Sequence, residues 1–141
     1  MTEIQYIGLA PTYAHEGDAG GDLRAAITRP VTIRPRETAW VPLGVKCAIP
    51  EGCFGLLTPR SGLGLKHGIT FTNSVGIIDS GYRGEISTRL VNLGDAPYTI
   101  HPADRVAQLI IVPFVSPTWV KADSLEETQR GEDGFGSSGV E

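Results

Sequence analysis

Short apolar stretches recur along the chain about every 8–12 residues, and clusters of turn-forming residues separate them. This rhythm is typical of a β-sandwich or a β-barrel. Glu85–Asn92 shows the strand pattern most clearly, because alternate residues differ in polarity. Ile86, Thr88, Leu90 and Asn92 share one face of that strand. The predicted strands are Ile4–Leu9, Thr38–Leu43, Val45–Ile49, Cys53–Thr58, Gly68–Asn73, Glu85–Asn92, Tyr98–Ile100 and Arg105–Phe114.

Arg105–Phe114 is ambiguous, because its nearly continuous apolar character fits either a buried strand or a short buried helix. The composition favours strands: β-branched residues are abundant, and Gly and Pro make up about a fifth of the chain. A chain of 141 residues is long enough for one domain with a core of its own. We therefore expect a single β-rich domain and exclude a long helical bundle.

The net charge and the cysteine content indicate which partners the protein can bind and in which compartment it works. A net charge of −4 gives no strong field to attract nucleic acid or an anionic membrane, so an anionic ligand must be held locally. The first ten residues do not resemble a signal peptide, and the longest apolar run, Leu109–Val115, is far shorter than the roughly 20 residues of a membrane helix. Cys47 and Cys53 are interpreted as buried thiols in a reducing compartment. These features predict a cytoplasmic protein that binds neither nucleic acid nor membrane.

The last twenty residues differ from the rest of the chain. From Lys121 the sequence becomes charged and then rich in glycine, so we expect a β domain over 1–121 and a flexible tail over 122–141. Arg130 and Phe135 place one cation and one aromatic side chain in that tail. Composition alone favours a frayed terminus. A mobile lid that orders on a ligand is the alternative.

The first cluster of candidate chemistry runs from Pro59 to Gly64, where a strand end leads into a glycine-rich turn. Arg60 can grip a phosphate with its forked guanidinium, Ser61 adds a hydroxyl, and Gly62 lets backbone N–H groups approach an anion. The pattern lacks the Gly-Lys-Ser/Thr ending of a P-loop. A plain turn explains it equally well.

The second cluster, Asn73–Glu85, reads as a narrow hairpin with strands only a few residues long. Asp79 follows two isoleucines, an apolar setting that could hold a carboxylate as a general base. Tyr82 offers a flat face for a sugar or a base, and Asn73 presents both a donor and an acceptor. A turn aspartate and a surface tyrosine are the structural alternatives.

The third cluster pairs Ala19–Leu23 with Asp104–Gln108, far apart in the sequence. Asp22 and Asp104 each stand where a turn enters an apolar stretch, a place where aspartate is more often a turn cap than a catalyst. The three histidines share no metal-ligand spacing, and we interpret them as solvated or structural.

Read in order, these clusters resemble the five motifs of the trimeric dUTPases, which hydrolyse dUTP to dUMP and pyrophosphate. The five segments are Ala19–Leu23, Pro59–Leu63, Asn73–Glu85, Asp104–Gln108 and Arg130–Gly139. Each is a weak signal alone, whereas five at the family's spacing are a strong one. The resemblance implies a jelly-roll-like β barrel or sandwich with at most one short helix, assembled as a homotrimer. It also implies three shared active sites, in which the phosphate turn, the hairpin and the closing tail come from different subunits.

The resemblance assigns a role to each candidate residue. Asp79 is expected to activate the water that attacks the α-phosphorus, and Gln108 to lie beside the α-phosphate. The other expected substrate contacts are Arg60, Ser61 and Gly62 for the phosphates, Asn73, Gly76, Ile77 and Ile78 for uracil, Tyr82 for deoxyribose, and Arg130, Phe135, Gly136 and Ser137 in the tail. Asp22 and Asp104 are expected to support these residues without contacting the substrate themselves. The expected metal is Mg²⁺, held by the triphosphate and water with no direct side-chain ligand. The implied role is to limit uracil in DNA and to supply dUMP for thymidylate synthesis.

Four positions depart from the family pattern. Gly21 replaces a larger side chain, which predicts a less rigid Asp22, and Ala103 replaces a frequent glycine, which puts that turn's geometry in doubt. Ser87 is shorter than its counterparts, and Asp133 adds a carboxylate near the expected triphosphate. Two other functions remain open: a dCTP deaminase or bifunctional relative on the same fold, and a non-catalytic binding or regulatory protein.

Overall fold

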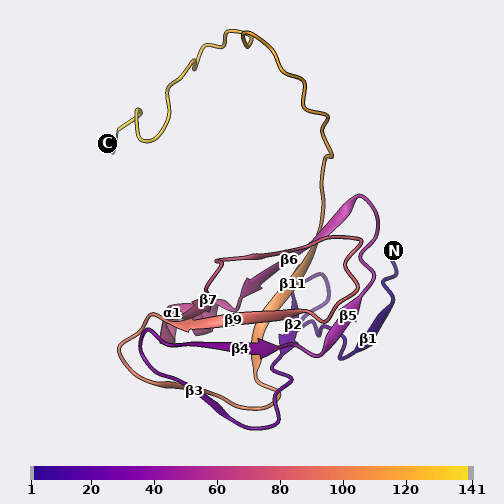
Figure 1. The fold of residues 1–141 in the computed structure, drawn as a ribbon, viewed down its shortest axis with the longest axis vertical. Helices are drawn as coiled ribbons and strands as arrows, with labels where there is room; N and C mark the ends of the chain where they lie inside the picture. The colour runs from indigo at the N-terminus through magenta and orange to yellow at the C-terminus, as the bar shows by residue number, and fades with distance from the viewer. Residues whose placement is uncertain (1, 140–141) are drawn as a thin grey trace.

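The chain folds into a β-rich body from which the C-terminal segment departs (Figure 1). The structure, a computed structural model, describes residues 2–139. Over that range the elements are β1 (Tyr6–Gly8), β2 (Gly21–Arg24), β3 (Val31–Ile33), β4 (Thr38–Pro42), β5 (Val45–Cys47), β6 (Cys53–Pro59), α1 (Ser61–His67), β7 (Ile69–Phe71), β8 (Gly76–Ile78), β9 (Ser87–Asn92), β10 (Tyr98–Ile100) and β11 (Arg105–Pro113). All eight predicted strands occur, most of them shortened at one or both ends. The prediction of an all-β chain with at most one short helix is confirmed for these residues.

The strands form four antiparallel groups rather than one closed barrel. The largest sheet has the order β2-β11-β6-β8, a second sheet has the order β4-β9-β7, and β1-β5 and β10-β3 are two-stranded. β11 has hydrogen-bonded neighbours on both sides, β2 and β6. These two pairings decide that the ambiguous segment is a strand, not a helix, and its apolar side chains are buried or half-buried along most of its length.

The core lies between the two larger sheets. Its most deeply buried side chains include Leu23, Ile33, Val41, Leu43, Leu57, Ile69, Ile86, Leu90, Ile100 and Val106. β9 buries the face that alternation predicts, and Asn92 is the polar member of that face. Its amide nitrogen donates to the carbonyl oxygens of Ile33 and Ala96, each at 2.8 Å, and its side-chain oxygen accepts from the Gly94 N–H at 2.8 Å. Full hydrogen bonding makes this burial tolerable.

The glycine-rich turn predicted after Pro59 is wrong, because Ser61–His67 forms helix α1. Leu63 anchors the helix in the core, and Lys66 and His67 stand in its last turn, where positive charge is favourable. Gly68 ends the helix with φ = 69°, and a Cβ there would lie 2.6 Å from the Gly94 nitrogen. The helix contains Gly62 and Gly64, and because glycine is a poor helix former, the sequence pattern indicated a turn instead.

After β11 the chain leaves the body, and Figure 1 shows it as an orange-to-yellow arc extending away from both sheets. In the described part of the chain, the backbone hydrogen bonds of this segment from Thr128 onward close local turns, such as that of the Gly131 N–H to the Thr128 carbonyl at 3.1 Å. Trp119, Leu125 and Phe135 are almost fully exposed. Within residues 2–139, no helix has the length and apolar character needed to span a membrane.

Candidate active site

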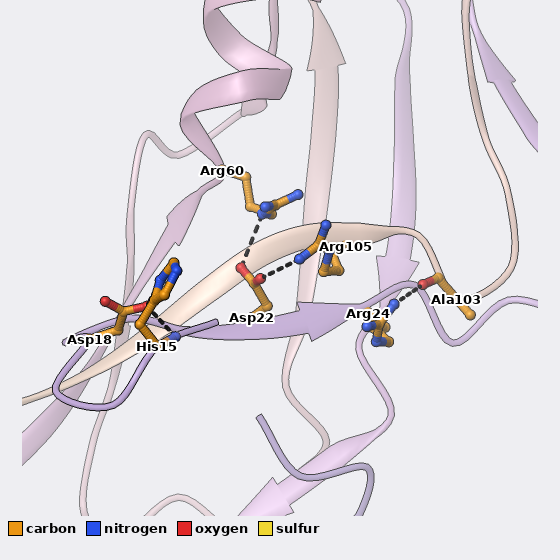
Figure 2. Close-up of polar contacts among 7 residues, drawn as sticks. All are labelled: His15, Asp18, Asp22, Arg24, Arg60, Ala103 and Arg105. Atoms are coloured by element: carbon orange, nitrogen blue, oxygen red, sulfur yellow. Dashed lines mark hydrogen bonds and ion pairs between the residues drawn. The ribbon is translucent and has the colours of Figure 1, made fainter. Parts of the chain in front are cut away.

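Asp22 connects two arginines from distant parts of the chain (Figure 2). Its Oδ1 lies 3.0 Å from Arg60 Nε, and its Oδ2 lies 3.3 Å from Arg105 Nη1. Only 13% of the Asp22 side chain is exposed, against 34% for Arg60 and 44% for Arg105. The carboxylate is therefore the inner member of the cluster, and it fixes Arg60 immediately before α1.

Sheet register brings these groups together. Gln108 of β11 lies opposite Asp22 of β2 on one side and Thr58 of β6 on the other. Arg60 follows β6 by one residue, so the three strands present Asp22, Gln108 and Arg60 in a row. Gly20 leaves room for the Gln108 side chain, because a Cβ at position 20 would collide with the Gln108 amide oxygen.

These residues line a pocket that we call the phosphate pocket. Its lining residues are Ala14, Asp18, Ala19, Gly20, Asp22, Arg60, Ser61 and Gln108. Asp22 pairs with Arg60 through Nε. The N–H groups on the two terminal nitrogens of the guanidinium therefore remain available to bind an anion. The N–H groups of Ser61 and Gly62, in the first turn of α1, have no acceptor within the helix. The predicted phosphate-binding residues thus lie around one hollow, with Gly62 next to it on the helix.

Gly21 does not loosen Asp22, contrary to the sequence-based expectation. The space of the missing side chain is filled, since a Cβ at Gly21 would lie 2.6 Å from Pro11 Cβ and 3.0 Å from the Tyr13 ring. Backbone hydrogen bonds to Thr12 (3.1 and 2.7 Å) fix Asp22 further. The ion pairs with the two arginines also hold the Asp22 side chain in place.

Asp104 lies outside the pocket. Its Oδ2 accepts from the His101 N–H at 2.8 Å and closes the turn between β10 and β11. Ala103, just before it, has φ = 67°. Glycine adopts this left-handed conformation without strain, whereas the Cβ of Ala103 makes it unfavourable, so the departure at this position affects the backbone of the turn.

The hairpin residues line a second hollow, the nucleoside pocket, which has two adjoining parts. One part, about 380 Å³, is lined by Trp40, Leu57, Phe71, Thr72, Asn73, Gly76, Ile77, Ile78, Ser87, Thr88 and Arg89. The other is lined by Trp40, Ile77, Ile78, Asp79, Tyr82, Glu85, Ile86 and Ser87. β8 is the only strand that the structure describes within Asn73–Glu85, and it pairs with β6 as the edge strand of the larger sheet, with Gly76 opposite Leu57. The predicted hairpin of two short strands is therefore wrong, and the hairpin below is the segment Asn73–Glu85. The structure therefore brings Asn73, Gly76, Asp79 and Tyr82 to one region.

Tyr82 is fixed at both ends. Its hydroxyl donates to the Glu85 carbonyl at 2.9 Å, and its N–H donates to the Asp79 carbonyl at 3.0 Å. Arg83 Nη1 donates to the carbonyls of Ser80 (2.6 Å) and Tyr82 (3.0 Å) and so braces the same loop. Asp79 is exposed on a single chain, although Ile77 and Ile78 line the same hollow, so the side chain is not buried among apolar groups.

The tail residues form a third, separate group. Arg130 Nε donates to the Asp133 carbonyl at 2.8 Å, and Phe135, Gly136 and Ser137 surround a hollow made within the tail itself. The phosphate pocket, the nucleoside pocket and this hollow share no lining residue. A single chain therefore keeps the three groups of predicted site residues apart.

Sequence reasoning missed Trp40 and Asp18. Asp18 lines the phosphate pocket and accepts from the His15 N–H at 2.9 Å. Trp40 lines both parts of the nucleoside pocket and is 66% exposed. A signal existed in the strand Thr38–Leu43, whose alternation places Trp40 on the face opposite the buried Val41.

Comparisons with known proteins show which proteins this chain is similar to. The dUTPase family model matches residues 8–139. The deoxyuridine 5'-triphosphate nucleotidohydrolase of Chlamydia pneumoniae is 49% identical over 139 residues, covering 98% of this chain and 96% of the relative. The protein of that name from Leifsonia xyli is 49% identical over 130 residues, covering 92% and 84%.

Among solved structures, the Staphylococcus bacteriophage 80alpha dUTPase with dUPNHPP has a TM-score of 0.90 and 31% identity, covering 99% of this chain and all of that one. The D95N mutant dUTPase of phage phi11 of S. aureus, described with a structural Mg(II) ion, has a TM-score of 0.80 and 27% identity, covering 89% and 100%. The family match, the relatives and the shared fold lead to one conclusion: this chain belongs to the dUTPase family.

Proposed function

We propose that this chain hydrolyses dUTP to dUMP and pyrophosphate, with Asp79 activating the attacking water. The observation that carries the proposal is the presence, on one chain, of a phosphate pocket with an ion-paired arginine and a separate nucleoside pocket edged by a carboxylate. The family's reaction needs both. The proposed physiological role is to limit uracil in DNA and to supply dUMP for thymidylate synthesis.

In the proposed reaction, the Asp79 carboxylate accepts a proton from water as the oxygen attacks the α-phosphorus. Negative charge then develops on the leaving pyrophosphate. The Arg60 guanidinium, the Ser61 hydroxyl and the first-turn N–H groups of α1 are donors suited to that charge, and Gln108 would orient the α-phosphate. The Asp22 ion pair supports this assignment, because a guanidinium held in place costs little reorganisation during the reaction.

The donor set of the phosphate pocket suits Mg²⁺ carried in by the substrate. Mg²⁺ in nucleotide sites usually keeps several waters and takes one or two carboxylates besides the phosphates. Asp18 and Asp22 line the pocket, and Asp22 is already shared between two arginines. We infer that the triphosphate and water hold the ion and that these carboxylates accept hydrogen bonds from its waters. When bound, Mg²⁺ would neutralise charge on the phosphates.

The nucleoside pocket supports selection for a deoxyuridine nucleotide. Asn73 and the backbone of Gly76, Ile77 and Ile78 offer donors and acceptors to a pyrimidine edge in a narrow space, which disfavours an added methyl or an exchanged amino group. Tyr82 is locked by its hydroxyl and cannot withdraw from a ribose 2′-hydroxyl. We assign discrimination of the base to the hairpin and discrimination of the sugar to Tyr82.

We infer a homotrimer in which neighbouring copies complete each site. Residues 1–121 would form the β domain, and residues 122–141 the closing tail. The separation of the two pockets supports this, as does a tail whose Arg130 and Phe135 contact no part of their own body in residues 2–139. The tail's Arg130 would reach the γ-phosphate, and Phe135 would cover the uracil. Free thiols at Cys47, which is buried, and Cys53, which is half-buried, support the assignment to the cytoplasm.

The test is pyrophosphate release with Mg²⁺ from dUTP, dTTP, dCTP and UTP by the wild type and Asp79→Asn. We expect release from dUTP alone and a loss of about 100-fold or more in the variant. Asp95→Asn, the same change at an exposed loop position, is the matched control. Equal turnover of all four nucleotides would refute the assigned specificity. A folded trimer that binds dUTP without turnover would favour a regulatory protein, and ammonia release from dCTP would favour a deaminase.

A further inference from the structure

Trp40 is a large aromatic residue that the rest of the described chain leaves mostly uncovered. It lies in β4 between Ala39 and the fully buried Val41, and alternation places its indole on the outer face of the sheet. There the side chain is 66% exposed. An aromatic of this area normally contributes by being covered, either by the core or by a partner molecule.

The position of Trp40 relates it to the nucleoside pocket. Four residues line both parts of that pocket: Trp40, Ile77, Ile78 and Ser87. Trp40 is the aromatic one among them. One part contains Asn73 and Gly76, and the other contains Asp79 and Tyr82. The indole therefore borders the regions assigned to the base and to the sugar.

Strand register explains how the indole reaches the hairpin. Trp40 lies opposite Arg89 and Pro42 opposite Ser87, so Trp40 and Ser87 are diagonal neighbours on one face. The side chain of Ser87 is short, so it leaves space beside Trp40 on that face. Arg89 Nε donates to Thr38 Oγ1 at 3.1 Å, which draws the long side chain away from Ser87. Trp40 and Arg89 both border the pocket beside the hairpin, and the short Ser87 leaves the diagonal position to the indole.

We propose that Trp40 is an additional substrate-binding residue, whose indole packs against the pyrimidine deoxyribonucleoside along the hairpin. The short Ser87 makes room for it, so the departure at position 87 is compensated from the neighbouring strand. This inference rests on the proposed function, because it refines how the same pocket holds its nucleotide. Trp40 supplies apolar contact area, while Asn73 and the hairpin backbone read the base.

The two tryptophans of the chain make the contact measurable. Trp119 is 91% exposed in the segment between β11 and the tail, and Trp119→Phe leaves Trp40 as the single indole. Titration of this variant with dUMP, and with a non-hydrolysable dUTP analogue, is expected to change the Trp40 emission saturably. In steady-state assays, Trp40→Ala is expected to raise KM for dUTP about tenfold with little change in kcat, and Trp40→Phe to recover most of the affinity. Trp119→Phe is the matched control and should keep the wild-type KM.

Three results would overturn the inference. They are an unchanged KM in Trp40→Ala, a Trp40 emission that does not respond to nucleotide, and a KM effect that disappears at protein concentrations where size-exclusion chromatography shows the assembly restored. The last would make Trp40 a residue of the subunit interface. Failure of the proposed function is distinguishable. If the wild type releases no pyrophosphate while dUMP still changes Trp40 emission, the contact stands and the reaction is wrong.

Discussion

Replacing Asp22 by asparagine tests the idea that an ion pair behind the phosphate pocket orients Arg60. The substitution keeps the shape of the side chain and removes its charge. At 3.0 and 3.3 Å and an effective dielectric of about 20, Coulomb's law gives an attraction of about 5 kcal/mol for each arginine. Lost hydration offsets most of this, because the carboxylate is largely buried. We expect the free energy of unfolding to fall by about 2 kcal/mol.

The same change should weaken phosphate binding. Arg60 would lose the acceptor that holds its Nε and would sample other rotamers, so ordering it would cost free energy on each binding event. We expect KM for dUTP to rise about tenfold, equivalent to about 1.4 kcal/mol. Urea denaturation and steady-state pyrophosphate release measure the two effects, with Asp95→Asn as the matched exposed control. Wild-type stability together with wild-type KM would refute the reasoning. Lower stability with unchanged KM would show that Arg60 is oriented without Asp22.

Three further predictions follow from particular features. Ala103→Gly should raise the free energy of unfolding by up to about 1 kcal/mol, since it relieves a left-handed alanine at φ = 67°; a lower thermal midpoint would contradict this. Deleting residues 122–141 should reduce kcat/KM for dUTP about 100-fold while circular dichroism and the oligomeric state stay unchanged, and retained activity would remove the tail from the site. Burial raises the pKa of the Cys47 thiol above its ordinary value of 9.0, although the Arg83 charge opposes this. The folded state thus favours the protonated thiol, and its contribution to stability, present below about pH 9, should be lost as the pH rises further. Cys47→Ser should flatten that part of the urea-denaturation profile.

Much of the fold was predictable because a strand shows an alternating pattern of side chains within its own few residues. Alternation in Glu85–Asn92 identified β9 and its buried face, and turn clusters bounded the other predicted strands, although β3 was not predicted. β2 was missed because Gly21–Arg24 is short and charged, and it becomes a strand only by pairing with β11. α1 was missed because two glycines hide the helical signal, and its first turn is fixed by Leu63 packing into the core.

The sequence by itself determined the all-β class and the order and spacing of the five motifs. These features depend on residue types and short-range periodicity, which no other part of the chain can alter. The tertiary structure alone decided that Asp22 pairs with Arg60 and Arg105, that Trp40 borders the hairpin, and that the phosphate and nucleoside pockets stay apart on one chain. Each of these depends on which strands become neighbours and in which register. Register is set by the burial of the whole core, so no local stretch of sequence contains it.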